Sequence, residues 1–94
     1  MVIRIVKMTF LESNINDFKE FVRTIEDTIR NFEGCEHLDI LQDLHNRNIF
    51  FSYSMWKSEE DLDNYRKSDF FKGTWAKVRQ WFGDRPRAWS VEKL

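Results

Sequence analysis

The stretch His37–Trp56, HLDILQDLHNRNIFFSYSMW, contains two strand-like segments separated by a polar turn. Residues His37–Leu44 alternate between apolar and polar side chains, and Ile49–Trp56 is rich in aromatic residues, as β-strands are. The sequence HNRN between them is typical of a turn. We therefore predict a β-hairpin in the middle of the chain.

Upstream of the hairpin, the sequence predicts a strand followed by a long helix. Residues 2–10 are rich in β-branched residues and carry apolar side chains on both faces, which indicates a strand that is covered on both sides. One of these faces carries Val2, Arg4, Val6 and Met8. Asn14, with Asp17 three residues later, resembles a capping box, and Gly34 is a typical helix stop. We expect an amphipathic helix between them.

Downstream of the hairpin, the order of elements is mirrored. Ser58 and Asp61 are spaced to cap a short helix, and Ser68 restarts the helix, which we expect to run to about Phe82. The sequence GDRP then breaks the helix. Residues 87–94 are predicted to form the final strand.

The predicted order is β-α-β-β-α-β, which defines an α+β fold of the ferredoxin-like type. We expect one domain over residues 1–94, with a four-stranded antiparallel sheet and helices on one face only. Phe50 and Phe51 are adjacent, so one of the two rings has to point away from the helices. A second copy of the chain, sheet against sheet, is the simplest cover for that bare face, and we expect a homodimer.

Charge and cysteine content exclude several classes of protein. The net charge is −1, and the aromatic segment Ile49–Trp56 lacks the glycine and basic residues of RNA-recognition strands, so we expect no nucleic-acid partner. Cys35 is the only cysteine, which suits a reducing compartment. No apolar run is long enough for a membrane helix, and residues 1–10 are too short and too charged for a signal peptide. We expect a cytoplasmic protein without a membrane partner.

Candidate catalytic and metal-binding groups are few. His37 and Asp39 share one face of a strand, but no third ligand follows at metal-binding spacing, so we expect no metal site. His37 is the only strand-borne group with an ordinary pKa near neutral pH, which makes it the best candidate for proton transfer. The alternative is a polar strand edge. We expect Cys35 to be a packed, inert thiol.

An aromatic stripe marks the last predicted helix, SDFFKGTW and the residues after it. One continuous face carries Phe71, Trp75, Val78 and Phe82 at helical spacing. Core packing explains Phe71 and Val78 well. Tyr65 and Trp75 have polar tips that need partners, so the wall of a ring-lined cavity between helices and sheet is the alternative for them.

Two segments resemble the antibiotic biosynthesis monooxygenase family: GCEHLDILQD (residues 34–43) and FFSYSMWKSEEDLDNYRKSDFFKGTW (residues 50–75). The resemblance implies a dimeric α+β barrel, in which two ferredoxin-like protomers press their sheets together and each keeps a pocket between sheet and helices. In the haem-degrading branch of the family, the iron-binding His aligns with Trp75, a haem-distorting Trp with Tyr65, and an Asn with Val6. Tryptophan cannot ligate iron, so we expect neither haem degradation nor any other cofactor.

The resemblance to the cofactor-free oxygenases implies a monooxygenase that acts on a small aromatic molecule or quinol. In that chemistry, the deprotonated substrate itself reduces O₂, and the protein supplies binding, deprotonation and exclusion of water. The implied substrate-binding residues are Arg4, Val6, Trp56, Tyr65, Phe71 and Trp75, with Arg4 as a partner for the substrate anion and His37 as the candidate base. Strand-end packing is an alternative role for Trp56. The alternative function is a non-catalytic or isomerase-like binder of small molecules.

Overall fold

The computed structural model describes residues 1–94. Its elements are β1 (Val2–Thr9), the 3-10 turn η1 (Glu12–Asn14), α1 (Ile15–Arg30), β2 (Cys35–Gln42), β3 (Ile49–Trp56), α2 (Glu59–Lys67), α3 (Asp69–Arg79) and β4 (Arg87–Val91). The predicted β-α-β-β-α-β order is confirmed, with the second helical segment divided at Ser68 as expected.

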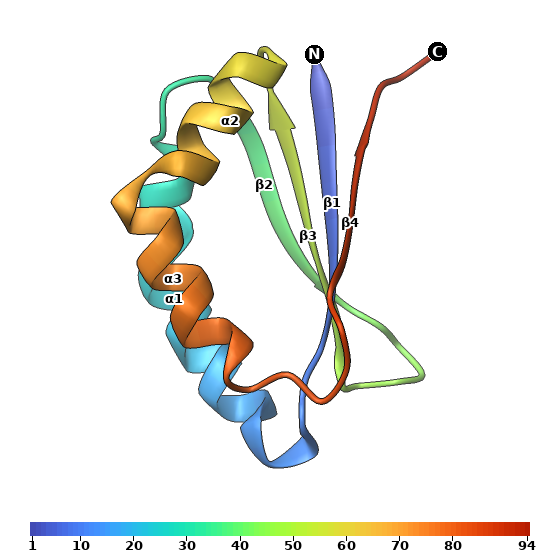
Figure 1. Cartoon of the computed structure of the whole chain (residues 1–94). Helices are drawn as coiled ribbons and strands as arrows, with labels where there is room; N and C mark the ends of the chain where they lie inside the picture. The colour runs from blue at the N-terminus through green and yellow to red at the C-terminus, as the bar shows by residue number, and fades with distance from the viewer.

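The four strands form one antiparallel sheet in the order β2-β3-β1-β4. All the helices lie on the same side of this sheet, and the other side is bare (Figure 1). The predicted α+β, ferredoxin-like fold is therefore confirmed. No helix combines the length and the apolar character that crossing a membrane requires.

Several boundaries differ from the predictions. The second strand runs two residues earlier than predicted, because Asp43 begins the turn: its Oδ1 accepts the backbone N–H of His45 at 2.9 Å and of Asn46 at 2.8 Å. The last helix ends at Arg79 and not at Phe82, because Phe82 lies outside the helix and pairs with Phe10 in an isolated antiparallel bridge.

The helix starts show which capping predictions were right. Ser58 Oγ accepts the backbone N–H of Asp61 at 3.1 Å, and Ser68 Oγ accepts that of Phe71 at 3.1 Å, so both serine caps are confirmed. Asn14 does occupy the cap position of α1, but its side chain makes no capping bond to the backbone. It donates to Asp17 Oδ2 at 2.8 Å instead, which corrects the predicted capping box.

The core lies between the sheet and α1, at the end of the sheet where β1 leads into η1. Phe10 is 1% exposed and stacks on Phe18 with ring centroids 4.3 Å apart. Phe50 meets Phe18 edge-on at 5.0 Å. The remaining buried members of this cluster are Met8, Val22 and Val78. These contacts fix the distance of α1 and α3 from the sheet.

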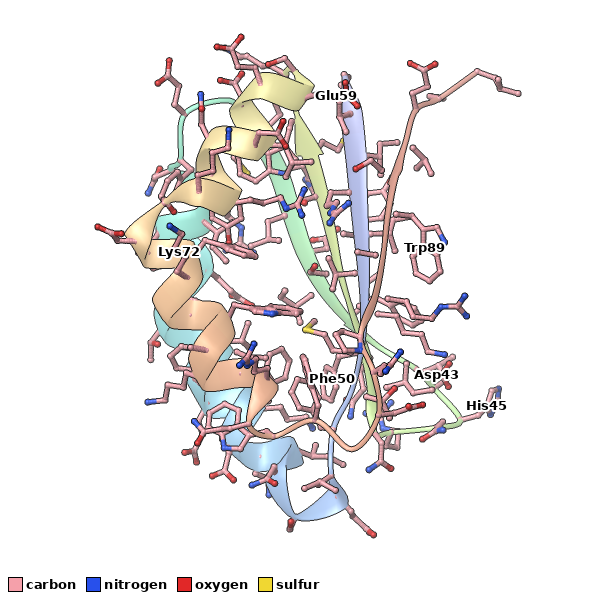
Figure 2. The ribbon with its side chains drawn as sticks, in the orientation of Figure 1. Asp43, His45, Phe50, Glu59, Lys72 and Trp89 are labelled. Atoms are coloured by element: carbon pink, nitrogen blue, oxygen red, sulfur yellow. The ribbon has the colours of Figure 1, made fainter.

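The opposite side of the sheet, called the outer face below, carries the alternate residues of each strand. Its members include Ile3, Ile5, Phe51, Tyr53, Met55 and Trp89, which are cross-strand partners in the sheet register. Figure 2 shows Phe50 on the helix side of the sheet and Trp89 on the outer face. The prediction that Phe50 and Phe51 point to opposite sides agrees with this register, since Phe50 is 3% exposed and buried in the core.

Candidate functional site

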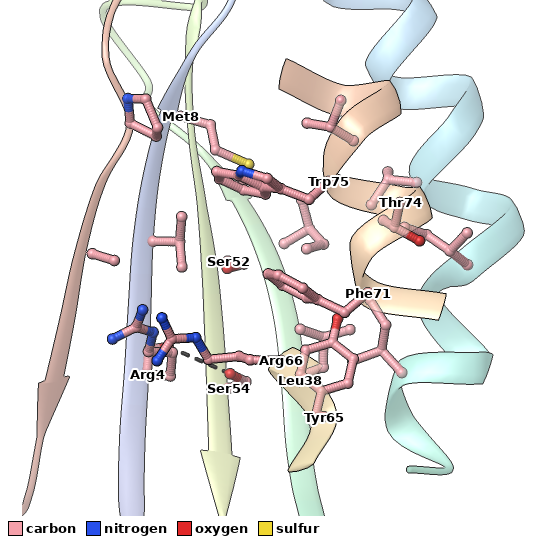
Figure 3. Close-up of a pocket in the computed structure, with 18 of the residues that line it drawn as sticks. Arg4, Met8, Leu38, Ser52, Ser54, Tyr65, Arg66, Phe71, Thr74 and Trp75 are labelled. Carbon is pink, nitrogen blue, oxygen red and sulfur yellow. Dashed lines mark hydrogen bonds between the residues drawn. The ribbon is translucent and has the colours of Figure 1, made fainter. Parts of the chain in front are cut away.

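A cavity of about 300 Å³ lies between the inner face of the sheet and the helices (Figure 3). This volume is at the lower end of the range for small-molecule sites, about 300–1,000 Å³. Most of the residues that line the cavity are hydrophobic. It adjoins the core, and Met8, Phe18, Val22 and Val78 belong to both the core cluster and the cavity wall.

Strand alternation selects which sheet residues reach the cavity. On β1, Arg4, Val6 and Met8 line the cavity, while Ile3 and Ile5 between them belong to the outer face. The predicted two faces of this strand are therefore confirmed. On β3, Ser52 and Ser54 line the cavity beside Trp56.

Four aromatic side chains from β3, α2 and α3 form one wall of the cavity. Trp56 and Tyr65 are stacked, with centroids 4.9 Å apart and planes at 27°. Tyr65 meets Phe71 edge-on at 5.2 Å, and Phe71 lies parallel to Trp75 at 6.0 Å and 9°. Phe71 and Trp75 keep part of their surface exposed, so this face of α3 lines the cavity as well as packing against the core.

Trp56 is a structural part of this wall. Its side chain is 1% exposed, and its indole N–H donates to Ser54 Oγ at 3.0 Å. Because the polar tip is already satisfied inside the chain, Trp56 offers a ligand only a ring surface. This geometry fits the strand-end packing role that the sequence left open, although the ring does line the cavity.

Tyr65 brings a polar atom into the apolar part of the cavity. Figure 3 shows its hydroxyl pointing into the space between helices and sheet, with no hydrogen bond to the other residues drawn there. Burial raises the pKa of Tyr65 well above its ordinary value, with a smaller contribution from Cys35. The phenol therefore stays protonated at neutral pH and can donate a hydrogen bond to a ligand oxygen.

Three arginines line the cavity, and two of them, Arg4 and Arg66, supply positive charge at one end of it, whereas the guanidinium group of Arg87 lies over the Trp89 ring, 5.7 Å from its centroid. Arg4 Nη1 donates to Ser90 Oγ at 3.0 Å, and Arg66 reaches the cavity from α2. Burial, and then the charge of Arg66, lower the pKa of Arg4, while Asp63 acts in the opposite direction. The Arg4 guanidinium group remains charged at neutral pH because the ordinary pKa of arginine is so high. The cavity can therefore attract an anion.

All six residues that the resemblance predicted for substrate binding line this one cavity: Arg4, Val6, Trp56, Tyr65, Phe71 and Trp75. Sequence reasoning missed Arg66, Ser52 and Ser54. Arg66 sits in the last turn of α2, where a basic residue is ordinary on a solvated helix, and no sequence signal separates it from Lys67.

His37 lies outside the cavity. The alternation on β2 places Leu38 on the cavity side, and His37 faces the other way, where its ring meets Tyr53 edge-on at 6.4 Å. Its Nε2 is 2.7 Å from Asp39 Oδ2, and both side chains are about half exposed. No group of three or more metal-binding side chains includes this pair. The geometry thus matches a polar strand edge and gives no support to His37 as a base in the cavity.

Cys35 has the surroundings of an unreactive thiol. Burial raises its pKa, which keeps the sulfur protonated, and Sγ lies 3.7 Å from the backbone oxygen of His37. The residue does not line the cavity.

Comparisons with known proteins agree with this geometry. The family profile described as antibiotic biosynthesis monooxygenase matches residues 1–77. No curated protein matches the chain in sequence. A Nitrosomonas europaea protein, provisionally described as an antibiotic biosynthesis monooxygenase, has a TM-score of 0.92 at 20% identity, covering 100% of this chain and 99% of that one. A conserved protein of Methanosarcina mazei Go1 has a TM-score of 0.92 at 23% identity, covering 100% and 94%.

At these identities the solved structures show a shared fold, which extends through β4, whereas the profile match ends within α3. The profile match spans most of the sequence and includes both segments in which the resemblance was first seen. The chain belongs to the antibiotic biosynthesis monooxygenase family.

Proposed function

We propose that the chain is a cofactor-independent monooxygenase acting on a small aromatic molecule or quinol bound in the cavity. The observation that carries this proposal is a ring-walled cavity with two guanidinium groups and a neutral tyrosine hydroxyl. Flat rings fit between aromatic walls, and the positive charges favour the ionised form of a phenol over the neutral form.

The chemistry relies on the substrate as the reductant. A phenolate or enolate passes one electron to O₂, and the two radicals that result combine into a carbon-bound peroxide. For an anthrone, the methylene carbon finally exchanges two hydrogens for one oxygen atom, and the second oxygen atom leaves as water. The chain contributes binding, exclusion of water and stabilisation of the anion.

No carboxylate and no imidazole line the cavity. In the proposed reaction, the substrate proton therefore passes to water, and Arg4 with Arg66 lowers the pKa of the substrate enough for this to occur near neutral pH. The same observation favours a second candidate function, a non-catalytic binder of small aromatic molecules. Binding of a quinol without oxygen consumption distinguishes this second function from the first.

We expect oxygen uptake above the buffer rate with at least one member of a panel of quinols and anthrones. Trp75→Ala is expected to lower the uptake about 10- to 100-fold, because removing a wall residue loosens substrate positioning. Trp81→Ala is the matched control, since this indole packs on Phe21 at 5.9 Å and does not line the cavity. An oxygen electrode measures all three proteins.

The same assay decides the role of His37. Its place outside the cavity predicts that His37→Ala leaves oxygen uptake unchanged. A loss of ten-fold or more would instead support the sequence-based prediction of a proton-transfer residue.

No uptake above buffer with any substrate would contradict the monooxygenase proposal for that panel.

We also propose that the chain forms a homodimer through its outer face. We propose in addition that it works in the cytoplasm, a reducing compartment in which its single free cysteine stays a thiol. The outer face carries apolar side chains on every strand, and Leu41, Trp89 and Val91 on it are 46%, 41% and 42% exposed. The same face of a second copy is a partner of matching size and chemistry. Covering it leaves the cavity on the other side of each sheet accessible.

A further inference from the structure

Arg4 and Arg66 bring their guanidinium groups to the same end of the cavity from different elements, β1 and α2. Figure 3 shows both groups near Ser54 on the strand side of the cavity, with Trp75 nearer the other end. The charge of Arg66 is close enough to lower the pKa of Arg4. The rest of the wall toward Trp75 is mainly apolar. The cavity is therefore asymmetric, with positive charge at one end and an apolar region toward Trp75 at the other.

The chain itself provides little compensation for these two charges. The one carboxylate that contacts Arg66 belongs to Asp63, at 3.8 Å, and both side chains are about half exposed. Such an exposed, long ion pair contributes little to stability because solvent screens it. The side-chain partner of Arg4 is a neutral hydroxyl, that of Ser90. Two like charges that face the same apolar cavity repel each other, and an anion bound between them would offset this repulsion.

The third polar element is the hydroxyl of Tyr65. Burial keeps this hydroxyl a protonated donor, and Figure 3 shows it entering the cavity from the helix side, across from the two arginines. Together these three side chains offer hydrogen-bond donors to a ligand, and none of them carries a negative charge that would repel an anion. A ligand group that fits them accepts several hydrogen bonds and carries negative charge. A carboxylate is planar and matches the fork of a guanidinium group.

We propose that the ligand is a flat aromatic carboxylate, whose carboxylate binds Arg4 and Arg66 and whose ring lies along Tyr65, Phe71 and Trp75. This deepens the proposed function, on which it rests, by assigning a permanent anionic group to the substrate. The carboxylate fixes the orientation of the ring in the cavity. Uncharged quinols of the same size enter the cavity but bind more weakly.

The test compares 2-naphthoate with 2-naphthamide, which has the same ring system and no charge. Isothermal titration calorimetry on the full chain is expected to show at least about 10-fold tighter binding of the naphthoate, as charge-assisted hydrogen bonds provide. Arg66→Gln and Arg4→Gln are each expected to reduce this preference to about 3-fold or less. Lys67→Gln removes a neighbouring charge on α2 that does not line the cavity, and it leaves the preference unchanged.

Thermal unfolding by circular dichroism identifies any variant that fails to fold. Arg66 is the decisive position, since its half-exposed side chain has no core contact to lose. Equal affinity for the two ligands, or no binding of either, overturns the inference. An unchanged preference in Arg66→Gln overturns it as well. Oxygen uptake with uncharged quinols but no naphthoate preference would overturn this inference alone, and a naphthoate preference without oxygen uptake would overturn the monooxygenase proposal alone.

Discussion

Replacing Gly34 with alanine is expected to destabilise the chain by about 3 kcal/mol. Gly34 has φ of 84°, a left-handed conformation that costs an L-residue about 1–2 kcal/mol. A Cβ at this position would also overlap the side chain of Asp61. Asp61 belongs to the first turn of α2, and its backbone N–H is capped by Ser58, so it cannot move away without disturbing the start of that helix. Overpacking of this kind adds about 1–3 kcal/mol.

Thermal unfolding measures the effect, and for a domain of this size we expect Tm to fall by more than about 10 °C. Gly73→Ala is the matched control, because a Cβ at Gly73 on α3 meets nothing within 4 Å. Alanine there should stabilise the helix by about 0.5–1 kcal/mol. Equal Tm values for wild type and Gly34→Ala would contradict the left-handed backbone and the close Asp61 contact at this corner between α1 and β2.

Replacing Ile5 with aspartate is expected to convert a dimer into a monomer. Ile5 lies on β1, one of the two central strands, with Tyr53 and Trp89 as its neighbours across the outer face. In a two-fold dimer both copies carry the substitution, so two carboxylates are buried in the interface without a partner. The free energy of association is then less favourable by several kcal/mol. Light scattering after size exclusion should give twice 11.5 kDa for the wild type and 11.5 kDa for the variant.

Thr28→Asp introduces the same charge on the exposed side of α1, away from the sheet, and should remain a dimer. Trp89→Glu, on the edge strand β4, tests the same face with less risk to the fold and should also weaken the dimer. A monomeric wild type, or a dimer that survives both outer-face variants, would contradict the proposed interface.

The fold could be predicted because its signals are local. The alternation on β1, the serine caps of α2 and α3 and the glycine at 34 each act over a few residues, and each has its expected place in the structure. Strand boundaries near Asp43 and the end of α3 were less accurate, since they depend on a side-chain turn and on a bridge to Phe10. Such interactions between distant residues leave no periodic pattern in the sequence.

The candidate site was predictable only in part, for a related reason. The resemblance brought six residues to one cavity, but Arg66 is recognisable as a cavity residue only after α2 has packed over β1 and β3. His37 was selected for its ordinary pKa, a property of the isolated side chain. Which face of β2 it occupies depends on register, and the register places Leu38 inside and His37 outside.

The space between helices and sheet is the proposed ligand site, and NMR on the ¹⁵N-labelled chain can locate a bound ligand there. Titration with 2-naphthoate, and separately with 2-naphthol, should shift the Trp75 indole and the backbone amides of Val6 and Thr74 most strongly, since all three residues line the cavity. The Trp89 indole on the outer face should shift little. The largest shifts at Trp89 and Tyr53, or no shifts with either ligand, would contradict this proposal.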